Sequence, residues 1–219
     1  FSEDSELTSI EKEAFGKTAI ENLVLPKHLT TIGEQPFYDR NRPLSIEFKE
    51  GSEIRLFDKK SFSADWLVKL EIPENVTEFR DEWCSFTPHL NEILISPKNK
   101  NLTYISQNKK IVAQKSNENC ENFDVLLFAC RDISKVSIPF NIKKIGSCSF
   151  DRCKNFKSIE FEGNSNLISI ESYAFNRTNI EKVTFPKKLK FIGKCAFACC
   201  IFLKKVEFSI DSELISIGE

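Results

Sequence analysis

The chain has 219 residues, of which 41% are hydrophobic and 29% charged, a composition typical of a folded protein with a solvated surface. Its 31 basic and 32 acidic residues give a net charge of -1, which offers no overall field for a polyanion, so we expect no nucleic-acid partner. No apolar run is long enough to span a bilayer, so we expect no direct membrane insertion of this segment.

One apolar pattern recurs along the whole chain. Aligned on the first aliphatic residue, its copies begin at Leu7, Leu29, Ile54, Val76, Leu102, Ile142, Leu167, Leu189 and Leu214. The intervals between these starts are 22, 25, 22, 26, 40, 25, 22 and 25 residues, so short and long copies alternate around one irregular interval. Self-similarity at such a period is typical of a solenoid, in which each turn packs on its neighbours.

The repeat organises the chain into a single expected domain over 1–219. We expect regular repeats at 1–96, an irregular block at 97–138 and regular repeats at 139–219. The opening residues FSEDSELTSI match FSIDSELISI at 208–217 and lack the features of a signal peptide. We therefore expect both ends to be cuts within a longer protein.

Each copy contains three stretches with different structural roles. The first, Leu-x-x-Ile, predicts a short extended segment, often ended by a glycine that permits a sharp turn: Gly33, Gly146, Gly193 and Gly218. The second holds a phenylalanine at a fixed offset, and stacking would make these rings a spine: Phe15, Phe37, Phe62, Phe150, Phe175 and Phe197. The third, x-Ile-x-Phe, alternates in polarity and predicts a half-buried strand: 23–25, 46–48, 70–72, 93–95, 136–138, 159–161, 183–185 and 206–208.

The irregular block predicts a hairpin of Lys110–Ala113 and Val125–Ala129. The polar turn between these strands, at 114–124, is either a binding feature or a poorly ordered loop. Cys120 lies in this turn and is the thiol we expect to be the most exposed.

The other cysteines predict buried thiols more readily than disulfides. Cys148 and Cys195 occupy one repeat position, and Cys153 and Cys200 occupy another, each pair two turns apart. Equivalent Cα atoms would then be about 10 Å apart, beyond the roughly 7 Å limit for a disulfide. Cys195, Cys199 and Cys200 are close in sequence but lack a histidine or a second Cys pair, so we expect no metal site.

The pattern L-x-x-I-x-x-x-A-F-x-x-C-x-x-L-x-x-I-x-F-P, clearest in LKFIGKCAFACCIFLKKVEF at 189–208, resembles the leucine-rich repeats of BspA-like surface proteins. Local departures are Pro36, Pro43 and the pair Trp83–Cys84 in place of Ala-Phe, which predicts irregularity in the fourth repeat. We expect a right-handed leucine-rich-repeat solenoid with a parallel sheet on one face and short extended, turn or 3₁₀ segments elsewhere, without long helices.

The candidate site is the outer face of the predicted strands, where the two x residues of each strand form columns. The protein-binding residues we select there are Lys69, Glu71, Lys135, Glu160, Lys182, Thr184, Lys205 and Glu207. A solvated sheet that balances its own charges is the competing interpretation. His28 and His89 are the only histidines, and no Ser or Cys lies in a nucleophile motif, so we expect no enzyme and no cofactor.

The resemblance implies a non-enzymatic module displayed at a cell surface that binds a protein ligand. Such repeats serve adhesion to host, extracellular-matrix or neighbouring-cell proteins. The alternative is a cytoplasmic leucine-rich-repeat scaffold for protein–protein interaction, which is favoured by cysteines that look reduced.

Overall fold

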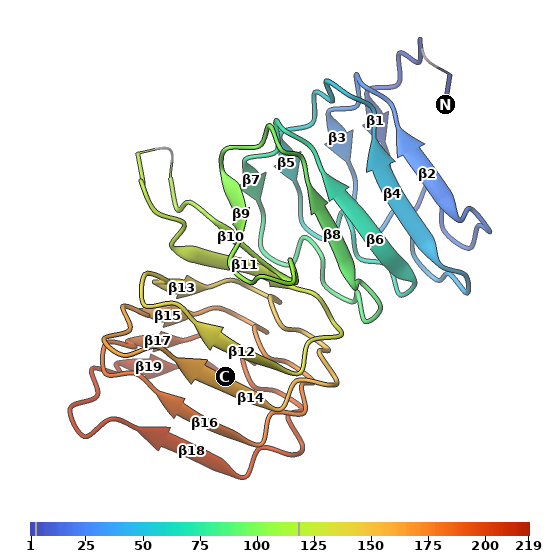
Figure 1. The fold of residues 1–219 in the computed structure, drawn as a ribbon. Coiled ribbons are helices and arrows are strands. Elements are labelled where there is room, and N and C mark those ends of the chain that lie inside the picture. Colours follow the sequence, from blue (N-terminus) through green and yellow to red (C-terminus); the bar gives the residue numbers. More distant parts are fainter. Residues whose placement is uncertain (3, 118) are drawn as a thin grey trace. The chain divides into compact units, whose positions relative to one another are not determined.

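The computed structural model describes residues 1–2, 4–117 and 119–219 and is shown in Figure 1. The chain forms two compact units, Phe1–Leu102 and Thr103–Glu219. Strands and turns make up the described residues, so the expected β-solenoid is confirmed, whereas no 3₁₀ helix forms in that part of the chain. These residues also contain no helix of the length and apolarity that crossing a membrane requires.

The first unit consists of long and short strands that alternate along the chain. Its strands are β1 (Ser9–Ile10), β2 (Asn22–Leu25), β3 (Thr31–Ile32), β4 (Leu44–Phe48), β5 (Leu56–Phe57), β6 (Leu67–Ile72), β7 (Glu78–Phe79) and β8 (Glu92–Ile95). The long strands form a parallel sheet in the order β2-β4-β6-β8, coloured blue to green in Figure 1. The short strands pair as β1-β3 and β5-β7, also in parallel.

The second unit repeats this arrangement with a hairpin at its start. Its strands are β9 (Leu102–Tyr104, whose first residue closes the first unit), β10 (Ile111–Gln114), β11 (Val125–Ala129), β12 (Lys135–Ile138), β13 (Lys144–Ile145), β14 (Ser158–Phe161), β15 (Ser169–Ile170), β16 (Lys182–Phe185), β17 (Phe191–Ile192), β18 (Lys205–Phe208) and β19 (Ser216–Ile217). The long strands form the parallel sheet β12-β14-β16-β18. The other sheet has the order β19-β17-β15-β13-β11-β10-β9.

All eight predicted x-Ile-x-Phe strands are present, but they form two sheets of four instead of one continuous face. The reason lies in the irregular block between β8 and β12. There β11 pairs antiparallel with β10, as predicted for the hairpin, and parallel with β13. The block therefore extends the sheet of short strands and contributes no strand that could continue the sheet of long ones.

The predicted phenylalanine spine is confirmed where turns stack directly. In the second unit, the ring centroid of Phe175 lies 4.8 Å from that of Phe150 and 4.9 Å from that of Phe197. In the first unit, the rings of Phe15 and Phe37 stack at 5.9 Å. Parallel, offset rings at these separations bury apolar area and add a favourable ring–ring contact.

The irregularity predicted for the fourth repeat does not reach its backbone, because Glu82 and Phe86 adopt positive φ of 62° and 58° at the repeat positions where Tyr173 and Arg177 do so in a regular turn. Trp83 takes the alanine position, and its buried ring lies 5.6 Å from that of Phe57 and 5.2 Å from that of Phe79. The amide of Phe62 donates to the carbonyl of Trp83 at 3.0 Å. The larger indole is therefore accommodated by an aromatic cluster within the first unit.

A third set of backbone hydrogen bonds joins consecutive solenoid turns through the segments that lie between the short and long strands. The amides of Phe150 and Arg152 donate to the carbonyls of Ala174 and Asn176 in the next turn at 2.7 and 2.8 Å. Non-glycine residues adopt the left-handed conformation here, for example Cys148 with φ of 55° and Tyr173 with φ of 58°. The stacked hydrogen bonds offset the strain that this conformation imposes on residues with a Cβ.

Gly146 and Gly193 come directly before a turn, as predicted, but the structure shows a second reason for a glycine at these repeat positions. Gly33 and Gly193 do not adopt positive φ; Gly51 is the glycine that does, at 74°. A Cβ on Gly193 would instead lie 2.6 Å from the amide nitrogen of Ser172 in the preceding turn. Gly33 is placed in the same way, with a Cβ position 2.7 Å from the nitrogen of Lys12. These glycines permit close approach of two turns.

Candidate functional site

The register of the long strands places the predicted outward residues in columns. In the second unit, Lys135 pairs with Ser158, Ser158 with Lys182, and Lys182 with Lys205. In the first unit, the corresponding column is Asn22, Ser45, Lys69 and Glu92. Because the sheets are separate, Lys69 and Glu71 lie on one face and the other six selected residues lie on another.

The two selected residues of the first unit are held by contacts inside their own sheet. The ammonium of Lys69 lies 2.6 Å from the carboxylate of Glu47, and this hydrogen bond raises the pKa of Lys69. The carboxylate of Glu71 accepts the backbone N–H of Phe48 at 3.0 Å. This face therefore agrees with the interpretation of a sheet that balances its own charges.

Glu207 is the centre of a similar network in the second unit. Its carboxylate accepts hydrogen bonds from Lys182 at 2.7 Å, from Lys205 at 2.7 Å and from the hydroxyl of Thr184 at 2.8 Å. These three donors, Lys182 first, lower the pKa of Glu207 to about 2. Four of the selected residues are thus occupied with one another.

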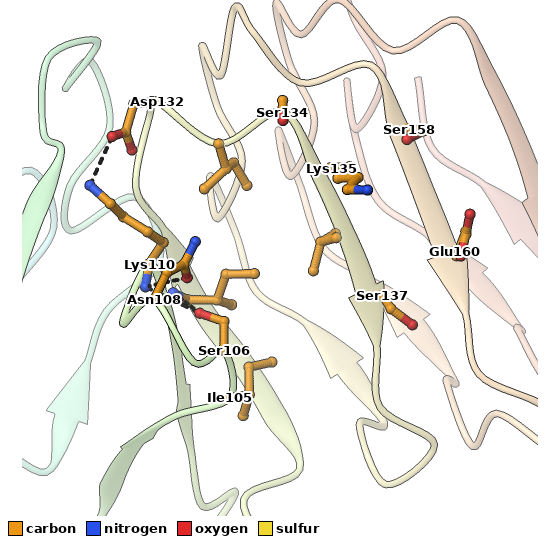
Figure 2. Close-up of a pocket in the computed structure, with 13 residues that line it drawn as sticks. Ile105, Ser106, Asn108, Lys110, Asp132, Ser134, Lys135, Ser137, Ser158 and Glu160 are labelled. Carbon is orange, nitrogen blue, oxygen red and sulfur yellow. Dashed lines mark hydrogen bonds and ion pairs between the residues drawn. The ribbon is translucent and has the colours of Figure 1, made fainter.

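Lys135 and Glu160 are different. Both side chains are exposed, and within the described residues neither makes a hydrogen bond or an ion pair. Both line an open cavity of about 520 Å³, a size within the range of small-ligand and peptide pockets. They are therefore the selected residues whose charges are free to meet a partner (Figure 2).

The cavity has a polar rim and an apolar base. Its remaining lining residues are Ile105, Ser106, Asn108, Lys110, Ile111, Asp132, Ile133, Ser134, Val136, Ser137 and Ser158. Lys110 on the rim is fixed by Asp132, with 2.8 Å between Nζ and Oδ2. The base is aliphatic and includes Ile111, Ile133 and Val136, which are buried in the core of the unit.

The loop between β9 and β10 forms one wall of the cavity and is held in place by its own side chains. The hydroxyl of Ser106 accepts the amides of Lys110 and Ile111 at 3.1 and 3.2 Å, and Asn108 accepts the amide of Lys110 at 3.2 Å. Strand alternation could not reveal these residues. The signal available in the sequence was the irregular repeat interval itself, which marks where the solenoid is interrupted.

The polar turn at 114–124 is anchored at both ends, although residue 118 lies outside the described residues. The carboxylate of Asp124 accepts the amide and the hydroxyl of Ser116 at 2.9 and 3.1 Å, and Lys143 lies 3.3 Å away. Burial raises the pKa of Asp124, but the bonds from Ser116 and the charge of Lys143 outweigh it and lower the pKa overall. That the turn at 114–124 is a binding feature stays a prediction.

All eight cysteines are free thiols, including the buried Cys148 and Cys153. The expectation that Cys120 is the most exposed thiol is wrong, because Cys199 is exposed and Cys120 is half-buried. The Sγ of Cys120 donates to the carbonyl of Asn122 within the same turn at 3.1 Å. The part of the chain described by the structure contains no group of three or more His, Cys, Asp or Glu side chains placed to hold a metal ion.

The solved structures similar in fold include bacterial leucine-rich repeat proteins. A leucine-rich repeat protein from Eubacterium ventriosum matches with a TM-score of 0.72 and 19% identity over 96% of this chain and 59% of that one. The pneumococcal vaccine antigen PcpA matches with a TM-score of 0.72 and 21% identity over 96% of this chain and 56% of that one. A leucine-rich cell surface protein from Faecalibacterium prausnitzii matches at 0.57 with 18% identity, over 91% and 62% of the two chains.

This chain therefore spans less than two thirds of the length of each of these proteins. No curated protein matches it. The model of the BspA type leucine-rich repeat region matches residues 1–113 and 121–219 in six copies. Together with the stacked turns and the phenylalanine spine, this match shows that the chain belongs to the family of BspA-type leucine-rich-repeat proteins.

Proposed function

We propose that this chain is a non-enzymatic protein-binding module displayed at a cell surface, where it serves adhesion to a host, matrix or neighbouring-cell protein. The observation that supports it best is the contrast on the outer face of the second unit. Lys135 and Glu160 carry charges without an ion-pair partner in the described structure beside an open cavity, whereas Lys182 and Lys205 are both paired with Glu207. A partner gains most by meeting charges that have no internal counterpart to give up.

Display at the surface is supported by what the similar proteins are called. One structural relative is a cell surface protein and another is a vaccine antigen. The proposal extends this setting to the present chain through its shared repeat family.

The two parts of the proposal are tested separately. Antibodies against this segment should stain intact, unpermeabilised cells of the source organism if the protein is displayed. Purified chain should bind matrix or host cells, and the charge reversals Lys135→Glu and Glu160→Lys should weaken that binding. A matched control is Glu78→Lys, which reverses an exposed glutamate on the short strand β7 of the other unit.

Each part of the proposal has a result that would exclude it. Staining only after permeabilisation would exclude display. Binding that survives both reversals, or that falls equally with Glu78→Lys, would exclude this face as the binding surface.

A cytoplasmic scaffold that uses the same face is the second candidate. Eight free thiols favour it, because secreted proteins tend to oxidise cysteines in pairs. The staining experiment distinguishes the two, and the binding variants apply to both.

A further inference from the structure

The second long-strand sheet has an open edge at β12. In the order β12-β14-β16-β18, the first strand is paired with β14 alone among the described strands. The carbonyls of Ser134 and Ile138 accept amides from the neighbouring chain segment at 2.9 and 3.1 Å. Since the backbone groups of a strand alternate between its two sides, the N–H and C=O groups of Lys135 and Ser137 face the open edge.

The cavity lies along this open edge. Figure 2 shows Ile105 and Ser106 on one side of Ser137, and Ser158 and Glu160 on the other. An open edge is normally covered or blocked by a charged or bulged strand, because unpaired backbone groups recruit another strand. Here the edge is flanked by about 520 Å³ of space with an aliphatic base, which leaves room for a strand to lie beside β12.

The charge at the edge indicates what such a strand would carry. Lys69 and Lys182, the lysines of two other long strands, each bind a carboxylate from an adjacent strand, at 2.6 and 2.7 Å. Lys135 has an open side where that adjacent strand would lie. An added strand with an acidic side chain on its outer face would give Lys135 the partner that the other two lysines find inside the sheet.

We propose that the open edge of β12 and its cavity bind an extended peptide segment of a partner protein, which adds to the sheet as a further strand. An acidic residue of the peptide meets Lys135, and aliphatic residues on either side of it point toward Ile111, Ile133 and Val136. This inference rests on the proposed function as a protein-binding module and names the chemistry of the partner segment. Main-chain hydrogen bonds provide the affinity, and the acidic-aliphatic alternation provides the specificity.

The probe is a fluorescein-labelled heptapeptide, acetyl-Ser-Val-Glu-Ile-Thr-Val-Thr-amide, titrated with the full chain and followed by fluorescence anisotropy. We expect saturable binding below about 1 mM. A peptide with lysine in place of the glutamate should bind at least about fivefold more weakly, because it places two ammonium groups together. No saturable binding of the acidic peptide, or equal binding of both peptides, overturns the proposal.

Backbone pairing has its own signature. Only every second amide of an added strand faces β12, so the peptide amides fall into two alternating sets. N-methylation of the set that faces β12 should weaken binding more than about tenfold. N-methylation of the set that faces away should leave binding within about twofold. This comparison uses the unaltered protein, and equal effects of the two sets overturn strand addition.

Ser137 provides the matched protein variants. Ser137→Pro removes the amide that faces the open edge, which an edge strand tolerates, whereas Ser137→Ala removes the hydroxyl and keeps the amide. We expect loss of peptide binding in the first variant and retention in the second. Binding that survives in a folded Ser137→Pro variant contradicts the proposal.

The failure of this inference is distinct from failure of the proposed function. If Glu160→Lys abolished binding to cells but no peptide bound the unaltered chain, the chain would still be a protein-binding module. Strand addition at β12 would then be excluded. A dimer of the chain that the peptide dissociates in sedimentation would identify a second copy as the occupant, and would overturn the assignment to a partner protein.

Discussion

The ammonium of Lys182 lies 2.7 Å from the carboxylate of Glu207 in β18, whereas Lys135 and Glu160, on the equivalent diagonal between β12 and β14, form no ion pair in the described structure. The neighbours of the two glutamates also differ. Glu207 also receives Lys205, and Glu160 has the uncharged Ser158 at the corresponding place. The glutamate at this repeat position is therefore ion-paired in one turn and has no ion pair in another.

The first prediction concerns the acid titration of Glu207. Hydrogen bonds from Lys182, Lys205 and Thr184 hold its pKa at about 2, below the ordinary value of 4.5. A carboxyl whose pKa is lowered by folding contributes stability that is present above pH 4.5 and is lost as pH falls toward 2. A carbon-13 NMR titration of glutamate carboxyls should show one group that titrates near 2.

The assignment is checked with Lys182→Met, which removes the first of the three donors. The pKa of Glu207 should rise toward its ordinary value in this variant, because a charge-assisted hydrogen bond to the ionised form is lost. A Glu207 carboxyl that already titrates above about 4 in the unaltered chain would contradict the network.

The second prediction concerns the phenylalanine spine. Phe175 is 1% exposed and is stacked between Phe150 and Phe197. Phe175→Ala should lower the free energy of unfolding by about 3–5 kcal/mol, because it removes buried ring area and leaves a cavity between two turns. Urea denaturation followed by circular dichroism measures the change.

Phe140→Ala is the matched control, since that ring is 55% exposed. Its effect should stay within about 0.5 kcal/mol, as is usual for surface substitutions. Similar losses in the two variants would show that the spine does not carry the stability assigned to it.

The strands and the spine were predictable because they follow from repetition. Alternation in x-Ile-x-Phe identifies the inward and outward residues of one strand, and eight copies of the pattern reinforce it. The break between β8 and β12 was not predictable in the same way. β11 pairs with β13 in the sheet of short strands, but the local pattern of Val125–Ala129 would suit either sheet.

The candidate site was predicted only in part for the same reason. Outward orientation of Lys135 and Glu160 follows from alternation, but their lack of an internal partner depends on neighbours in other turns. The cavity combines residues from 105 to 160, and Ser106 and Asn108 belong to a loop with no repeat position. Periodicity carries no information about such a loop.

The third prediction concerns the close approach of adjacent turns. A Cβ on Gly193 would lie 2.6 Å from the amide nitrogen of Ser172 and 2.7 Å from the carbonyl carbon of Glu171. Both atoms are backbone and cannot move aside as a flexible side chain would. Gly193→Ala should therefore lower the free energy of unfolding by about 1–3 kcal/mol, measured by urea denaturation.

Gly163→Ala is the control, because no atom lies within 4 Å of the position its Cβ would occupy. That variant should stay within about 0.5 kcal/mol of the unaltered chain. If Gly193→Ala proved equally mild, the turns would be more loosely packed than the structure shows.

The fourth prediction concerns the thiols, which differ in burial although all are free. Burial raises the pKa of Cys153 to about 11, against an opposing effect of the Arg131 charge, whereas Cys199 is exposed at the surface. At pH 8 roughly one Cys153 thiol in a thousand is ionised, and the thiolate is the species that reacts. Iodoacetamide should therefore modify Cys199 within minutes and leave Cys153 unmodified in the folded chain, as followed by peptide mass spectrometry.

The control is the chain unfolded in about 8 M urea, where both thiols should react alike. Equal rates at Cys153 and Cys199 before denaturation would mean that the turn around Cys153 opens readily and that its burial does not protect it.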